Sequence, residues 1–278
     1  MLIFVNKILI LFFIFTKISF TQSDLLNQKE YADSLYLSQN YFDAIKEYKR
    51  LIFFDRENLF TYYSYSQMAK CYKDGGKFED SYNYFSLALS VANSYKEVFD
   101  SKIEICRLNI IQKKIKNTHR ILDELEKDSL FDDFKNQIKF WRAWTFYFEM
   151  NFEKAHNLFD ELGKKDLSEQ AKKLSEESYS VEKAKILSMI LPGTGQFYTN
   201  NYLSGLGSFA WNLLSGYLTI NAFSNERIFD GIIMSNFLWL RFYKGNLENA
   251  EKFASQKNEE LFNSSLNFLY LNFPEEIP

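Results

Sequence analysis

A repeat of constant length constrains the fold of this chain more than any other feature of its sequence. Ala44, Ser81, Thr118 and Ala155 follow one another at intervals of 37 residues. An aromatic or aliphatic residue lies three positions before, four after and seven after each of them. A second small residue lies twelve positions before each, in the order Ala32, Ala69, Cys106 and Ala143. A constant period of this length predicts helical hairpins that stack on one another and share a core.

The small residues mark where the two helices of each hairpin cross closely, and the larger ones fill the groove beside the crossing. These residues resemble tetratricopeptide repeats, whose first helix carries Gly or Ala three residues before an aromatic and whose second carries Ala four before Phe. The resemblance covers residues 25–162 and implies an all-α solenoid that binds proteins and has no catalytic residues. The period exceeds the family's usual length of about 34, and the third repeat has Asn109 and Thr118 where the family prefers an aromatic and Ala. An ordinary helical bundle is the alternative.

Composition restricts the chemistry of the chain. Ten glycines and 3 prolines in 278 residues favour long helices. Cys71, Cys106, His119 and His156 are the only cysteines and histidines, and they supply too few ligands and nucleophiles for a defensible site. We therefore expect no enzyme, no metal and no cofactor, and we identify no small-molecule substrate. The net charge of −3 does not favour nucleic acid as a partner.

Residues 1–21 predict a secretory signal peptide. Lys7 precedes an apolar run, and Ser19 and Thr21 provide the small residues of a cleavage site before Gln22. The run is too short to span a membrane comfortably, and Lys17 interrupts it. A retained anchor is the alternative to cleavage. In either case we expect the repeats, residues 22–167, in the periplasm of a bacterial cell envelope.

The resemblance also implies a groove for a protein or peptide partner, lined by the first helix of each hairpin. Its predicted lining is Asp33, Tyr36, Lys70, Lys73, Arg107, Trp144 and Tyr147. The three cations of this set suit an acidic group, although cations on helix faces are commonly just solvated. The aromatic residues of the fourth repeat have internal packing as their alternative.

After a linking helix, predicted over residues 168–183, the chain changes character. Two apolar segments, 202–223 and 228–243, lie within a predicted membrane-associated helical hairpin, residues 184–246. At 1.5 Å per residue they reach about 33 Å and about 24 Å, so the first is long enough to span a membrane and the second is marginal. We expect membrane lipid around this hairpin, in the inner rather than the outer membrane, and a C-terminal helix and tail over residues 247–278.

A short motif opens the hairpin. Pro192, Gly193, Gly195, Gln196 and Tyr198, with Gly205 downstream, resemble the P-G-x-G-Q-x-Y motif that precedes a short hydrophobic hairpin in uncharacterised bacterial membrane domains. Proline ends the preceding helix, and the glycines permit backbone conformations closed to other residues. We expect Gln196 and Tyr198 to bond backbone groups exposed by this break.

Together these features predict a membrane-tethered scaffold or adaptor of the cell envelope. The alternative is an accessory factor in membrane-protein assembly or transport, with the hairpin as its active part. The flanking charges conflict with a periplasmic location for the repeats. The outer flanks of the hairpin carry Lys183, Lys185, Arg241 and Lys244, and only Arg227 lies in its turn, which reverses the usual bias of positive charge toward the cytoplasm.

Overall fold

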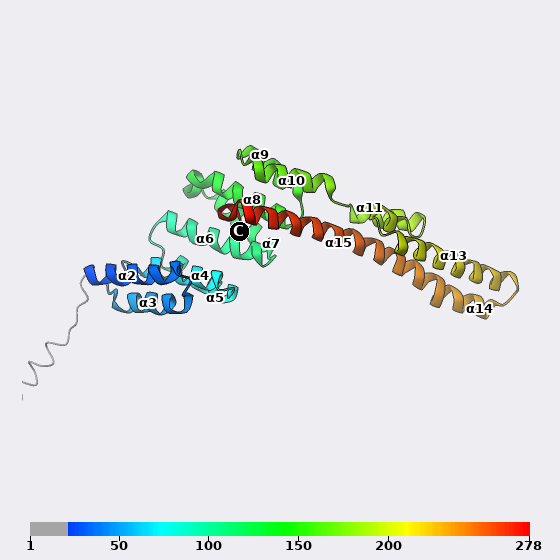
Figure 1. The fold of residues 1–278 in the computed structure, drawn as a ribbon, viewed down its shortest axis with the longest axis horizontal. Coiled ribbons are helices and arrows are strands. Elements are labelled where there is room, and N and C mark those ends of the chain that lie inside the picture. The colour runs from blue at the N-terminus through cyan, green and yellow to red at the C-terminus, as the bar shows by residue number, and fades with distance from the viewer. Residues whose placement is uncertain (1–21) are drawn as a thin grey trace, which may run out of the picture. The chain divides into compact units, whose positions relative to one another are not determined.

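The computed structural model describes residues 22–278, and all regular secondary structure in this range is helical (Figure 1). The predicted signal peptide, residues 1–21, lies outside the described residues. The chain divides into two compact units, one up to Phe148 and the other over Glu149–Ile277. This boundary falls inside the predicted fourth repeat. The all-α class is confirmed for the described residues.

The first unit consists of helices that pack against their neighbours in sequence, as a repeat solenoid requires. In chain order these are α2 (Gln22–Leu37), α3 (Tyr41–Phe54), α4 (Thr61–Asp74), α5 (Phe78–Ser90), α6 (Tyr95–Ile111), α7 (Ile115–Lys127), the 3₁₀ helix η1 (Ser129–Phe134) and α8 (Lys135–Phe148). The pairs α2–α3, α4–α5 and α6–α7 are the first three predicted hairpins.

The small residues of the repeat lie where the helices cross, as predicted. Ala44, Ser81 and Thr118 are completely buried, and so are the residues twelve positions before them. In the second hairpin the Ser81 hydroxyl donates a hydrogen bond of 2.8 Å to the carbonyl of Ala69. A larger side chain at either position would separate the two helices.

The turn of each hairpin repeats the same period in its backbone. Gln39, Gly76, Lys113 and Met150 have φ angles of 63°, 73°, 56° and 61°, and these positions are again 37 residues apart. In the first three turns this left-handed residue donates to the carbonyl three residues back, and the next residue donates to the carbonyl five back. This arrangement satisfies carbonyls that the helix end leaves free. Only one of the four residues is glycine, so packing imposes the conformation on the others.

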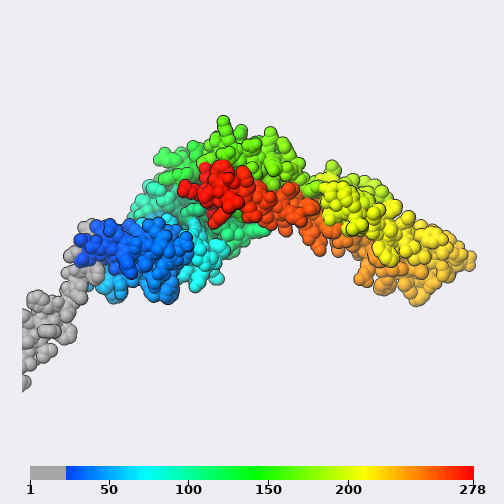
Figure 2. Space-filling model, in the orientation of Figure 1, coloured from blue at the N-terminus to red at the C-terminus, as the bar shows by residue number. Residues whose placement is uncertain are grey.

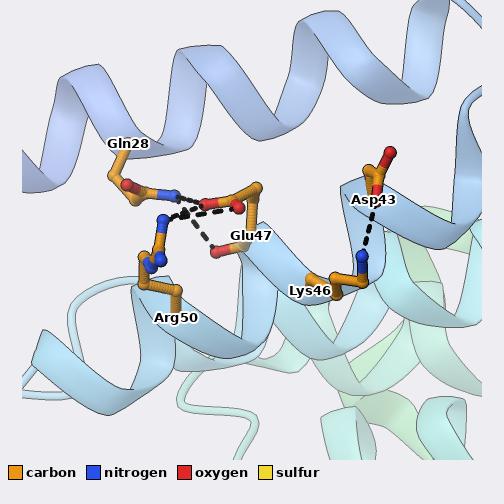
Figure 3. A network of polar contacts seen from close by, with 5 residues as sticks. All are labelled: Gln28, Asp43, Lys46, Glu47 and Arg50. Atoms are coloured by element: carbon orange, nitrogen blue, oxygen red, sulfur yellow. Dashed lines mark hydrogen bonds and ion pairs between the residues drawn. The ribbon is translucent and has the colours of Figure 1, made fainter.

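Polar contacts join the first two helices at their surface (Figure 3). Gln28 of α2 donates to the Glu47 carboxylate of α3 at 2.6 Å, and Arg50 donates to the same carboxylate at 3.1 Å. One turn away, Lys46 pairs with Asp43 at 2.7 Å within α3. Ion pairs at a surface contribute little to stability individually, and the buried face of α3 provides the core contact.

The second unit contains one further helix pair and the predicted hairpin. Its elements are α9 (Phe152–Glu161), α10 (Lys165–Glu177), α11 (Val181–Ile190), α12 (Thr194–Tyr198), α13 (Tyr202–Ser224), α14 (Ile228–Ile233), the π-helix η2 (Met234–Trp239), α15 (Leu240–Asn272) and the 3₁₀ helix η3 (Pro274–Glu276). The first arm of the hairpin is α13, and the second is α14 with η2 and the start of α15. The two arms pack side by side (Figure 1).

The helix ends of this unit differ from two predicted boundaries. The linking helix over residues 168–183 is interrupted, because α10 ends at Glu177 and α11 begins at Val181. The Ser180 hydroxyl caps α11 by accepting from the Lys183 amide at 3.1 Å. The hairpin also has no helix end near residue 246, since α15 runs without a break from Leu240 to Asn272.

Within residues 22–278, no helix combines the length and the apolar character that a membrane crossing requires. The expectation that the first arm spans a membrane differs from this finding. Asn212, Ser215 and Thr219 lower the mean hydropathy of α13, although the helix is 23 residues long.

Candidate functional site

A pocket of about 420 Å³ opens on the first unit, lined mainly by α4 and α6. These are the first helices of the second and third hairpins, the helices predicted to line a groove. Polar side chains of both helices reach the pocket, namely Tyr62, Ser66, Gln67, Lys70, Asp100 and Glu104. Phe85 and Phe99, which are almost fully buried, provide apolar wall. The pocket therefore offers polar groups beside an apolar surface, as binding sites commonly do.

Glu104 organises the charges of this pocket. Its carboxylate accepts from Lys73 at 3.1 Å and from Arg107 at 2.7 Å, and the Arg107 guanidinium lies 5.0 Å from the centre of the Trp141 ring. Burial acts to raise the pKa of Glu104, but the two cations outweigh it and hold this pKa below its usual range. Lys73 and Arg107 thus already have an acidic partner within the chain.

Lys70 differs from the other two predicted cations. It is half-buried and lines the pocket, and it forms no ion pair with any residue from 22 to 278. The carboxylate of Asp100, on the facing helix, pairs with Lys96 at 2.8 Å. Among the described residues, Lys70 therefore provides a cation without an ion pair in the pocket wall, and the two carboxylates of the lining are neutralised by Lys96, Lys73 and Arg107.

Asp33 and Tyr36 hold α2 against its neighbours. Asp33 accepts from the hydroxyls of Tyr48 and Tyr63, both at 2.7 Å, and from Lys29 at 2.8 Å. Burial opposes ionisation of Asp33, yet these three donors lower its pKa. The Tyr36 hydroxyl donates to Asp74 of α4 at 2.7 Å. Burial and this carboxylate raise the pKa of Tyr36, so both residues act as links between successive helices.

Trp144 and Tyr147 do not line an open groove. Both side chains are completely buried, and their ring centres lie 5.2 Å apart. The predicted surface role for these two aromatic residues is therefore wrong, and the alternative of internal packing holds. Helix α8 is aromatic on nearly all sides, so its sequence did not distinguish a covered face from an open one.

In the second unit, the motif residues form a buried polar cluster. The Gln196 side chain is completely buried. Its amide nitrogen donates to the Asn246 carbonyl at 3.0 Å and to the Ser208 hydroxyl at 3.2 Å, and its amide oxygen accepts from Ser188 at 3.0 Å. Gln196 thus joins α11, α12, α13 and α15 at one point. The Asn246 side chain completes the cluster by donating to the Ser188 carbonyl at 3.0 Å.

The glycines of the motif permit this close packing. Gly193 has φ 94°, and a Cβ atom there would overlap the Gly205 carbonyl. A Cβ atom on Gly195 would overlap the Ala184 carbonyl and lie 2.8 Å from the Ala250 methyl carbon. A Cβ atom on Gly205 would lie 2.8 Å from the Phe197 ring. These three positions therefore exclude larger residues.

The helix break at the motif agrees with the structure, whereas Gln196 and Tyr198 bond a backbone group of α15 and one just before α11 rather than groups exposed by the break. Helix α11 ends at Ile190, two residues before Pro192. Gln196 bonds the backbone carbonyl of Asn246, and the Tyr198 hydroxyl accepts from the Ser180 amide at 3.2 Å. The motif therefore acts as a structural junction that sets α13 against α11 and α15.

Sequence reasoning missed Glu104 and Asn246. The spacing of Glu104 and Arg107, three positions apart on one helix, is a local signal that favours an ion pair. Asn246 has no comparable signal, because it lies 50 residues from Gln196.

Comparisons with protein-family models, with characterised proteins and with solved structures found no match to this chain. The fold itself is that of sequentially packed helix pairs, consistent with a repeat solenoid.

Proposed function

We propose that this chain is an adaptor of the bacterial cell envelope whose repeats, of tetratricopeptide type, bind a protein partner. The observation that carries the proposal is the pocket between α4 and α6 with Lys70 at its wall. Its walls come from the first helices of two successive hairpins, so an extended segment of a partner would contact both repeats. Binding of this kind needs no catalytic group.

The charges of the pocket favour an acidic segment. Lys70 lines the pocket beside Asp100 and Glu104. Both carboxylates already have cationic partners, Lys96 for Asp100 and Lys73 with Arg107 for Glu104. The resulting positive potential attracts carboxylates during encounter. Lys70 donates to the partner directly in this scheme, while Lys73 and Arg107 keep their bonds to Glu104. Gln67 and Ser66 supply neutral hydrogen-bonding groups along the same wall.

A photo-crosslinking amino acid at position 67 tests this binding site in cells. We expect one set of crosslinked partners for the otherwise natural chain and loss of that set with Lys70→Glu. Lys127→Glu is the matched control, because Lys127 is exposed on α7 and lies outside the pocket. Identical partner sets for all three chains would overturn the proposed contact.

The proposed location rests on the sequence pattern. We propose that residues 1–21 direct export, that the repeats lie in the periplasm and that the hairpin associates with the inner membrane. Reporter fusions after Leu167 and after Lys252 test this arrangement. Cytoplasmic reporter activity from the first fusion would contradict it.

A second candidate function rests on the hairpin itself. Many of its large apolar side chains are exposed, among them Leu203, Ile228 and Phe229, which suits a factor that contacts other membrane proteins during assembly or transport. Deleting residues 184–245 separates the two functions. Survival of the position-67 crosslinks favours the adaptor, and their loss with a folded first unit favours the accessory factor.

A further inference from the structure

The first arm of the hairpin has its polarity reversed. The buried residues of α13 are all small or polar, namely Gly205, Asn212, Ser215, Gly216, Thr219 and Ala222. Its large apolar residues face outward, with Leu203 87% exposed and Tyr217 64% exposed. A helix that packs in water shows the opposite arrangement, with its apolar stripe inward.

The second arm follows the same rule. Phe229 and Phe237 are 74% and 71% exposed, whereas Gly231 is buried. The glycines let the arms approach closely, because Gly231 lies against the Phe223 ring and Gly216 against the Trp239 ring. Small residues at a close helix contact are typical of helices packed in lipid. The two arms, yellow to orange, lie next to each other in the space-filling view (Figure 2).

Charged residues occur only at the two ends of this hairpin. Between Ile186 and Leu240 the only charged residues of the sequence are Glu226, Arg227 and Asp230. They lie in the turn and at the start of α14, where Arg227 and Asp230 pair at 3.7 Å. The sides of both arms are uncharged and apolar. A protein partner with one flat surface would cover only one side of the hairpin, whereas the acyl chains of lipids would cover all of its exposed sides at once.

At the opposite end from the turn, Arg241 and Lys244 follow the apolar region. They lie three positions apart on α15, both are exposed, and neither forms an ion pair with a residue of the range 22–278. Of the acidic residues in the next turns, Glu251 pairs with Lys185 at 2.7 Å and Glu248 is exposed without a salt bridge to the described residues. Guanidinium and ammonium groups beside an apolar surface suit lipid phosphates.

We propose that acyl chains surround the two arms of the hairpin, over residues 202–240, and that Arg241 and Lys244 bind the headgroups of anionic phospholipids at the base of these arms. This inference rests on the proposed membrane association and names the lipid class that the chain would select. The apolar arms would provide attachment to any phospholipid, and the two cations would provide the preference for negative charge.

The full chain is tested with vesicles of phosphatidylcholine alone and of an equal mixture with phosphatidylglycerol. The emission of Trp211 and Trp239, both exposed in the hairpin, reports insertion, and cosedimentation gives the partition coefficient. We expect a blue shift with both vesicles and a partition coefficient about thirtyfold higher for the anionic ones, as two cations near the surface would give. Arg241→Gln/Lys244→Gln should keep the blue shift and lose the preference. Lys172→Gln/Lys173→Gln, which removes two exposed cations of α10, should change neither.

The possible results separate the two levels of the proposal. Equal binding of the natural chain to both vesicles, with a blue shift, overturns the lipid preference and leaves membrane association intact. Loss of the preference in the α10 control also overturns the role of Arg241 and Lys244. No binding to either vesicle, with stable oligomers in buffer, overturns both levels and identifies a second copy of the chain as the cover of the apolar surface.

Discussion

Glu104 provides the sharpest test of how the first unit is held together. Glu104→Gln keeps the size of the side chain but removes the charge that neutralises Lys73 and Arg107. The side chains of Lys73, Glu104 and Arg107 are 15%, 18% and 24% exposed. Removing one partner of a buried pair costs 3–5 kcal/mol because the other charge stays buried and uncompensated. Since these side chains retain some solvent, we expect the lower end of that range, about 3 kcal/mol.

Urea unfolding followed by circular dichroism measures this cost. Glu57→Gln is the control, because Glu57 is exposed and has no partner among the described residues, and its change should stay within about 0.5 kcal/mol. The triple variant Lys73→Met/Glu104→Leu/Arg107→Met removes all three charges and should recover most of the lost stability. A cost below about 1 kcal/mol for Glu104→Gln, or a triple variant as unstable as the single one, would refute this reasoning.

The same carboxylate predicts a pH dependence. Its pKa in the folded state lies below the unfolded value, so its contribution to stability is complete above about pH 5. This contribution disappears as the pH falls through the folded pKa. The natural chain should therefore lose more stability on acidification than Glu104→Gln does. Parallel acid titrations of the two proteins would contradict this assignment.

Three further predictions concern glycines, turns and thiols. Gly195→Ala should destabilise the second unit by more than about 3 kcal/mol in urea unfolding. Gly207→Ala is the control and should leave the stability unchanged, since its added methyl group meets no atom within 4 Å. Equal effects of the two substitutions would contradict the close packing at the motif. Lys113→Gly should stabilise the chain by up to about 1 kcal/mol, and Gly76→Ala should lower its stability by a similar amount. An increase in stability with Gly76→Ala would contradict the left-handed conformation of the turns. Burial, with the added effect of Asp74 on Cys71, raises the pKa of the Cys71 and Cys106 thiols to about 12. A disulfide reagent at pH 8 should therefore modify these thiols only when the chain unfolds. Rapid reaction of the native chain would contradict their burial.

The period of 37 was sufficient to predict the helices of the first unit and the burial of their crossing residues. The small side chains of Ala44 and Ser81 let two helices approach closely at these positions, so side-chain size alone was enough to predict the helix crossings. The backbone conformation of the turns was not predicted. Gln39 and Lys113 carry no signal for a left-handed conformation, which the packing of the two helices imposes.

The candidate site was predicted less completely. The sequence indicated which helices form the pocket, and it identified Lys70, Lys73 and Arg107 as cations on them. It did not indicate that Glu104 engages two of the three, because the Lys73 contact joins different hairpins, 31 residues apart. In the second unit, hydropathy located both arms of the hairpin.

Helix α15 has a mechanical consequence for the second unit. Near its start, Phe242 stacks on Trp211 of the hairpin with ring centres 5.3 Å apart. Near its other end, Phe262 lies beside Phe152 of α9 and Ser265 bonds Gln170 of α10. No proline interrupts its 33 residues, so the rise from Phe242 to Phe262 is about 30 Å. A lipid surface that holds the hairpin would therefore keep α9 and α10 at a fixed distance from that surface, and the length of α15 would set this distance.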